Sequence, residues 1–144
     1  MIRRAESKDF DAIMALGREL HEKIGGLPEI DDRGCRMLLA GSLAHKRRLI
    51  LVAERNGAIT GFMFCMVEEL FYSKAKYASD VILYANDGFS GALMVRRFMR
   101  WAKTMSVAQI QLGVSSGLNV DRLERLYQKL GLAKAGALFI GRPV

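Results

Sequence analysis

The sequence predicts an α/β (α+β) fold: one domain with a mixed, mostly antiparallel central sheet and helices on both faces. Three observations predict it. The chain has 144 residues, which suits one domain with its own core. Asn56-Gly57 separates two apolar, strand-like runs, as in a tight β-hairpin, because both residues tolerate the positive φ angles of such a turn. Beyond this hairpin, strand-like and helix-like segments alternate, so crossovers should bring helices to both faces of the sheet.

The chain is expected to begin with a short strand over residues 1–4 and a helix. Ser7 or Asp9 can cap this helix, whose apolar positions recur at helical spacing. It should end after about four turns at Gly25 and Gly26, which favour helix ends.

A second helix is expected after Asp31, which can cap it. This helix fades into the basic run HKRR, residues 45–48, which we interpret as a solvated helix end. The two strands of the hairpin then cover residues 49–55 and 58–67.

In the second half, residues 77–85 are expected to form a strand that is largely buried on both faces. Another strand is expected over residues 108–114. A helix that Asn119 caps is expected over residues 120–132. Residues 134–144 are expected to form a last strand or a bent hairpin. Between the first two of these strands, an amphipathic helix should bury Met94, Phe98, Trp101, Ala102 and Met105.

Composition limits the classes of protein that fit this chain. The longest uncharged apolar stretch, residues 57–67, is far too short to cross a bilayer, so no membrane partner is expected. The N-terminal segment lacks the pattern of a secretory signal, which favours a cytoplasmic protein. Cys35 and Cys65 lack the spacing of a zinc or redox motif, so we expect reduced, mostly buried thiols and no metal. The net charge of +7 fits nucleic acid, an acidic surface or a polyanionic small molecule.

The segment YANDGFSGALMVRRFMRWAK, residues 84–103, passes from a predicted strand through two glycines into a predicted helix. Phosphate-holding turns are often built in this way, because main-chain N–H groups and the helix dipole converge at the start of a helix. It matches no phosphate motif cleanly, so an ordinary helix start is the alternative interpretation.

The order of these elements, with RLYQKLGL before the last strand and FMRWAK after the turn, resembles the GNAT superfamily of N-acetyltransferases over nearly the whole chain. The C-terminal half is similar to small bacterial and phage-associated members. The resemblance implies a single GNAT-like domain over residues 1–144 that uses acetyl-CoA as cosubstrate and needs no metal.

In that family, a turn of pattern Q/R-x-x-G-x-G/A holds the pyrophosphate of acetyl-CoA. Here the pattern falls on residues 86–91, where only Gly91 matches, so the turn is degenerate. Asp87 and Phe89 depart from it, and Gly88 is expected to supply the unusual turn angles one position early. The cofactor-binding residues that the resemblance implies are Ile82, Leu83 and Tyr84 through their main chain, Gly88, Phe89, Ser90, Gly91 and Ala92 in the turn and helix start, and Asn119.

Tyr127 matches the family's tyrosine that protonates the departing thiolate, and a positioned phenol can do this work. It also lies on the apolar stripe of its predicted helix, where an aromatic residue can simply be part of the core. If the acceptor is an ammonium group, a base must free its lone pair, and Glu68, Glu69 and Asp80 lie near strand ends where one could act.

The first hypothesis is an acetyl-CoA-dependent N-acetyltransferase in which an amine of a small molecule or peptide attacks the acetyl group directly. The second is a catalytically inactive GNAT-like binding or assembly module, derived from a phage or prophage. A nucleic-acid binder is the third and is disfavoured, because aromatic residues are not interleaved with the basic ones on one face. A homodimer is plausible by family habit.

Overall fold

The computed structural model describes residues 1–114 and 116–143, and the chain forms two compact units, 1–111 and 112–144. The second unit contains the helix α4 (Val120–Lys129). The elements of the first unit are β1 (Ile2–Arg4), the 3-10 helix η1 (Ser7–Asp9), α1 (Phe10–Lys23), α2 (Asp32–Ser42), β2 (Arg48–Arg55), β3 (Ala58–Glu69), β4 (Lys76–Ala85), α3 (Ser90–Thr104) and β5 (Gln109–Gln111).

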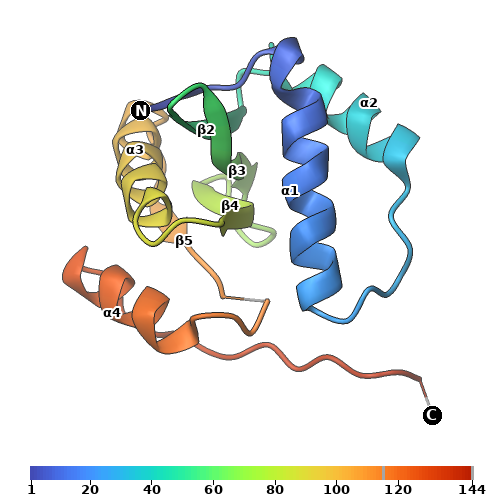
Figure 1. Cartoon of the computed structure of the whole chain (residues 1–144). Coiled ribbons are helices and arrows are strands. Elements are labelled where there is room, and N and C mark those ends of the chain that lie inside the picture. Colours follow the sequence, from blue (N-terminus) through green and yellow to red (C-terminus); the bar gives the residue numbers. More distant parts are fainter. Residues whose placement is uncertain (115, 144) are drawn as a thin grey trace. The chain divides into compact units, whose positions relative to one another are not determined.

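The five strands of the first unit form one sheet in the order β1-β2-β3-β4-β5. The strands β1 to β4 pair with one another in antiparallel fashion, and β5 pairs with β4 in parallel. In Figure 1, α1 and α2 cover one face of this sheet and α3 covers the other. The predicted fold class, a mixed and mostly antiparallel sheet with helices on both faces, is confirmed.

The β2–β3 hairpin turns at Asn56 and Gly57, whose φ angles are +53° and +79°. Both angles are left-handed, as a two-residue hairpin turn requires, so the predicted hairpin is confirmed. The two strands pair from Arg55–Ala58 at the turn to Arg48–Met66 at the far end.

The core of the first unit lies between the middle strands and the helices on either side. Residues 49–53 of β2 and 61–65 of β3 are buried, and so are Met94, Phe98, Trp101 and Ala102 of α3. The predicted apolar face of this helix is therefore confirmed except at Met105, which is half-buried just after the helix. Cys65 is buried as expected, and its burial, with the charge of Asp80, raises the pKa of its thiol.

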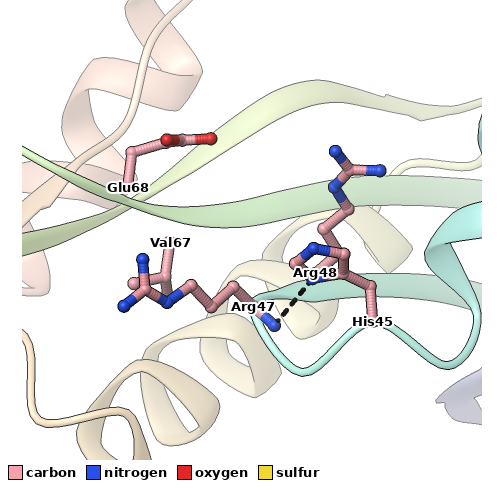
Figure 2. Close-up of a pocket in the computed structure, with 5 residues that line it drawn as sticks. All are labelled: His45, Arg47, Arg48, Val67 and Glu68. Atoms are coloured by element: carbon pink, nitrogen blue, oxygen red, sulfur yellow. Dashed lines mark hydrogen bonds between the residues drawn. The ribbon is translucent and has the colours of Figure 1, made fainter.

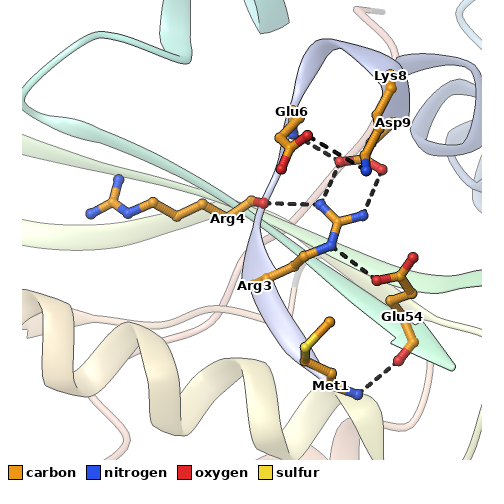
Figure 3. A network of polar contacts seen from close by, with 7 residues as sticks. All are labelled: Met1, Arg3, Arg4, Glu6, Lys8, Asp9 and Glu54. Atoms are coloured by element: carbon orange, nitrogen blue, oxygen red, sulfur yellow. Dashed lines mark hydrogen bonds and ion pairs between the residues drawn. The ribbon is translucent and has the colours of Figure 1, made fainter.

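An ionic network that was not predicted from the sequence joins the N-terminus to the first helix (Figure 3). Arg3 donates two hydrogen bonds to Asp9, at 2.8 and 2.9 Å, and a third to Glu54 on β2 at 3.1 Å. The Asp9 side chain is only 4% exposed and also accepts the main-chain N–H of Glu6. The network therefore joins β1, β2 and the start of α1.

Several predicted elements differ from the structure. Residues 134–143 contain neither the predicted strand nor a hairpin, and Leu138, Phe139 and Ile140 are exposed there. Since a strand is stabilised by pairing, an apolar run without a partner strand does not become one. Residue 144 lies outside the described residues.

The prediction that β4 is largely buried on both faces is wrong, because only Ala78 and Tyr84 are buried and Val81 is half-exposed. The basic run 45–48 is not a helix end either. Although Asp31 caps α2 as expected, by accepting the N–H of Gly34, the helix ends at Ser42 and Arg48 begins β2. No helix in the described part of the chain is long and apolar enough to span a bilayer.

Candidate functional site

The strands β4 and β5 pair over only three positions, from Tyr77–Gln109 to Ser79–Gln111. β4 continues to Ala85, and no other strand of the described residues pairs with that edge beyond Ser79. Between Asp80 and Ile82, the register between β3 and β4 shifts by one residue, so β4 carries a bulge at Val81. Residues 80–85 of β4 therefore present a main-chain edge to which β5 does not pair.

The main-chain groups at this edge follow from the register. Asn86 N donates to Thr60 O of β3 at 2.9 Å, and Tyr84 and Ile82 lie two and four residues earlier. Because alternate residues of a strand turn their N–H and C=O groups to opposite edges, Ile82 and Tyr84 face β3. Leu83 faces the open edge, so it is the one of these three predicted residues whose N–H and C=O can hold an extended amide there.

The turn between β4 and α3 is closed by the carboxylate of Asp87. This carboxylate accepts the main-chain N–H groups of Phe89, at 3.0 Å, and Ser90, at 2.6 Å, and the Ser90 hydroxyl as well. These donors lie at the start of α3, where the helix dipole favours a negative charge. Asp87 therefore occupies the position that an external anion would take at this helix.

Asp87 is ionised because these donors stabilise its charge. Burial opposes ionisation, but the hydrogen bonds, chiefly the two from Ser90, outweigh it and hold the pKa of Asp87 well below its usual range. In the described residues, no Lys, Arg or His lies within 4.0 Å of this carboxylate as an ion-pair partner. Its charge is compensated by dipoles rather than by a cation.

Gly88 does not have the role that was predicted for it. Its φ angle is not left-handed, and a Cβ at this position would meet no atom within 4 Å. Phe89 has φ −144° and ψ −18°, and its half-exposed ring lies 4.5 Å from the guanidinium of Arg55. The turn is therefore shaped by the Asp87 cap rather than by glycine. Ser90, Gly91 and Ala92 follow as the first residues of α3.

In the second unit, Tyr127 is buried on α4 and its hydroxyl donates to the main-chain carbonyl of Gly113 at 3.2 Å. Gly113 follows the end of β5 by two residues along the chain. Asn119 precedes α4 with φ +53°, and its side chain makes no capping hydrogen bond, so the predicted cap is wrong. A left-handed residue turns its side chain away from the first-turn N–H groups that a cap must reach.

Two of the three candidate carboxylates lie at a strand end, as predicted. Glu68 and Glu69 end β3, whereas Asp80 lies in the middle of β4, opposite Cys65 and next to the bulge. Glu69 forms a 3.8 Å ion pair with Arg47, and Glu68 lines a cavity with His45, Arg47, Arg48 and Val67 (Figure 2). Neither this cavity nor the Asp87 cap was predicted from the sequence. An Asp followed by Ser three residues later, and a basic run directly before a strand, were the available signals.

Compared as a sequence, the chain matches no protein-family model and no curated protein. Solved structures do resemble it. A protein named as an acetyltransferase from Agrobacterium tumefaciens str. C58 matches with a TM-score of 0.75 and 19% identity, over 99% of each chain. A protein from Clostridium acetobutylicum that is named as an acetyltransferase and was solved with acetyl-CoA has a TM-score of 0.73 and 21% identity, over 99% of this chain and 95% of its own.

The aminoglycoside antibiotic 6'-N-acetyltransferase of Acinetobacter haemolyticus also matches, with a TM-score of 0.70 and 13% identity, over 100% of this chain and 99% of its own. At such identities the likeness concerns the fold. The chain therefore has a GNAT-like fold.

Proposed function

We propose that this chain is an N-acetyltransferase that transfers the acetyl group of acetyl-CoA directly to an amine. The observation that carries the proposal is the open edge of β4, which runs from Asp80 to Ala85 and leads into a turn at the start of α3. An extended amide chain can pair with such an edge, and a phosphate can bind at such a helix start. Structures with this fold that are named as acetyltransferases add support.

The residues of the first unit fit this cosubstrate in two different ways. Leu83 offers main-chain N–H and C=O groups to the amide arm without rearrangement. The N–H groups of Phe89 and Ser90 already bind Asp87, so they become available to a pyrophosphate when this carboxylate turns away. Because Asp87 competes for these N–H groups, we expect CoA to bind measurably but with weakened affinity. Bound acetyl-CoA would supply an activated acetyl group.

Tyr127 is proposed as the acid that gives its Oη proton to the departing sulfur. The support is its match to the family motif and its fixed hydroxyl, which donates to Gly113 O. The main-chain carbonyl positions this phenol, and its proton must turn from Gly113 O to the departing thiolate for the transfer. Asn119, Gly91 and Ala92 are retained as proposed cofactor contacts through the resemblance.

The test is titration calorimetry with CoA, followed by an acetyl-transfer assay on a panel of amines. Tyr127→Phe should keep CoA binding and lose turnover by about a hundredfold, a usual size for a lost general acid. Tyr72→Phe, at an exposed tyrosine of the β3–β4 connection, is the matched control and should change neither quantity. Absence of CoA binding at millimolar concentration would contradict the proposal.

The Asp87 cap also favours the second hypothesis, an inactive GNAT-like binding or assembly module. A helix start that carries its own anion needs no ligand to be satisfied. The two functions differ in one measurement: an inactive module should bind no CoA even after Asp87→Asn, which removes the charge and keeps a capping side chain.

A further inference from the structure

A cavity lies at the end of the sheet where β2 begins and β3 ends. It is lined by His45, Arg47, Arg48, Val67 and Glu68. Figure 2 shows two guanidinium groups, an imidazole ring and a carboxylate around the same space, with Glu68 on the β3 side. Both signs of charge therefore meet in one cavity.

The backbone that carries the basic side chains is held in place by hydrogen bonds. His45 N donates to Ser42 O, Arg48 N donates to His45 O, and the carbonyl of Arg47 accepts Val67 N at 2.8 Å. The segment between α2 and β2 is thus tied both to the helix end and to β3. Its side chains extend from a fixed base, which favours a binding site over a mobile charged surface.

Most donors of this cavity have no strong partner within the described part of the chain. The Arg48 guanidinium makes one hydrogen bond, to Ser42 Oγ at 3.2 Å, and that of Arg47 makes only the 3.8 Å ion pair with Glu69. His45 Nδ1 accepts Arg47 N, so in this tautomer the ring proton is on Nε2, which is a donor. These donors suit a carboxylate or phosphate group, which guanidinium binds with two parallel hydrogen bonds.

Glu68 adds a negative charge that a simple anion site would lack. Its side chain is exposed and makes no hydrogen bond or ion pair among the described residues. A carboxylate next to an anion site repels a plain anion, but it attracts an ammonium group on the same ligand. The arrangement therefore selects for a zwitterion.

The register places this cavity beside the paired end of β4. Val67 and Glu68 lie opposite Ala78 and Tyr77, two of the three β4 residues that also pair with β5. The open edge of β4 begins two residues beyond Ala78, at Asp80, and runs toward the turn at 86–91. Strands lie about 4.8 Å apart and rise about 3.4 Å per residue, so roughly 10 Å separate Val67 and Glu68 from the point where that edge begins.

We infer that this cavity binds the acetyl acceptor, and that the acceptor is a zwitterionic amine with a carboxylate or phosphate group. Arg47, Arg48 and His45 hold the anionic group, while Glu68 attracts the ammonium group. This inference rests on the proposed acetyltransferase function for the identity of the ligand as acceptor, but the binding itself does not depend on it.

The first experiment measures binding without cosubstrate, by NMR shifts of the ¹⁵N-labelled full chain. The probes are 2-aminoethyl phosphate and β-alanine as zwitterions, and inorganic phosphate and ethanolamine as the separate charges. Both guanidinium Nε signals and the Val67 and Glu68 amides should shift with a zwitterion, and at least one zwitterion should bind more tightly than either separate charge. The tighter zwitterion identifies the anionic group.

Two variants test the roles of the two charges. Arg47→Gln should weaken zwitterion binding about tenfold, as expected for a lost hydrogen bond between charged groups. Glu68→Gln should weaken binding of the zwitterion and tighten binding of inorganic phosphate. Arg96→Gln, which removes one charge from the exposed side of α3, is the matched control and should leave all four affinities unchanged.

Zwitterions that cause no shift at these residues would overturn the inference. So would a Glu68→Gln variant whose affinities for the zwitterion and for inorganic phosphate change in the same direction. The transfer assay separates this failure from that of the proposed function. Equal kcat/KM for ethanolamine and 2-aminoethyl phosphate, unaffected by Arg47→Gln, overturns the zwitterion site and leaves the acetyltransferase in place. Zwitterion binding at the cavity without any acetyl transfer would overturn the proposed acetyltransferase function and leave the zwitterion site in place.

Discussion

Asp9 and Asp87 are both ionised carboxylates at helix starts, on opposite faces of the same sheet, yet they differ in what balances their charge. Asp9 is held by the Arg3 guanidinium, and this hydrogen bonding holds the pKa of Asp9 below its usual range. Asp87 is held by the main chain and hydroxyl of Ser90 and by Phe89 N. A carboxylate paired with a half-buried cation is structural, because removing it takes away that cation's closest ionic partner. A carboxylate held by dipoles occupies a place that another anion can take.

The largest effect that would test this comparison is the loss of stability in Asp9→Asn. This change leaves Arg3, whose side chain is 19% exposed, with only Glu54 as an ionic partner. We expect the free energy of unfolding, measured with urea, to fall by about 3 kcal/mol. Asp11→Asn on the same helix removes an exposed partner of Arg36 and should change it by less than about 0.5 kcal/mol. Equal losses would mean that the Arg3 network is no more than a surface feature.

Asp87→Asn should affect both stability and binding. Asn keeps a capping oxygen but loses the charge that the lowered pKa of Asp87 marks as stabilising, so the free energy of unfolding should also fall. Without the charge at the start of α3, CoA should bind about tenfold more tightly by calorimetry. Asp121→Asn, in the first turn of α4, is the control for charge alone. An unchanged or weaker affinity in Asp87→Asn would show that the pyrophosphate does not use these amides.

Protonation of Asp9 and Asp87 should contribute to the pH dependence of the free energy of unfolding. Each has a pKa in the folded chain below the value of about 3.9 expected for an unfolded Asp. Their stabilisation is therefore complete above about pH 5 and is lost as the pH falls below about 4 toward the folded pKa values, since the unfolded chain then binds more protons. Urea unfolding at a series of pH values should give a steeper acid decline for the wild type than for Asp9→Asn or Asp87→Asn. Identical slopes would contradict the ionic assignment.

The smallest expected effect concerns the glycine of the turn. Gly88→Ala should change the unfolding free energy by less than about 1 kcal/mol, because φ is not left-handed there and a Cβ has open space. Gly57→Ala, at φ +79°, should be clearly destabilising by comparison. Thermal unfolding of the two variants is sufficient to compare them. If Gly88→Ala were the more harmful, the turn would depend on glycine rather than on the Asp87 cap.

Local patterns in the sequence were enough for most of the fold. The Asn56-Gly57 turn, the Asp31 cap and the apolar face of α3 each depend on residues a few positions apart, so they can be read directly from the sequence. The tail over residues 134–143 was mispredicted, because a strand depends on a partner that may lie anywhere in the chain. The bulge in β4 was not foreseen for the same reason.

The same distinction between local patterns and interactions with distant residues applies to the candidate site. By itself, the sequence determined the order of the main strands and helices from β1 to α4, the location of the turn at 86–91 and the motif around Tyr127. Only the tertiary structure decided that Leu83 turns its main-chain groups to the open edge of β4, and that Glu68 lines one cavity with Arg47 and Arg48. The physical reason is that hydrogen bonds and charge pairing act over a few ångströms in space. The direction of a side chain and the register of the strands decide which groups come that close.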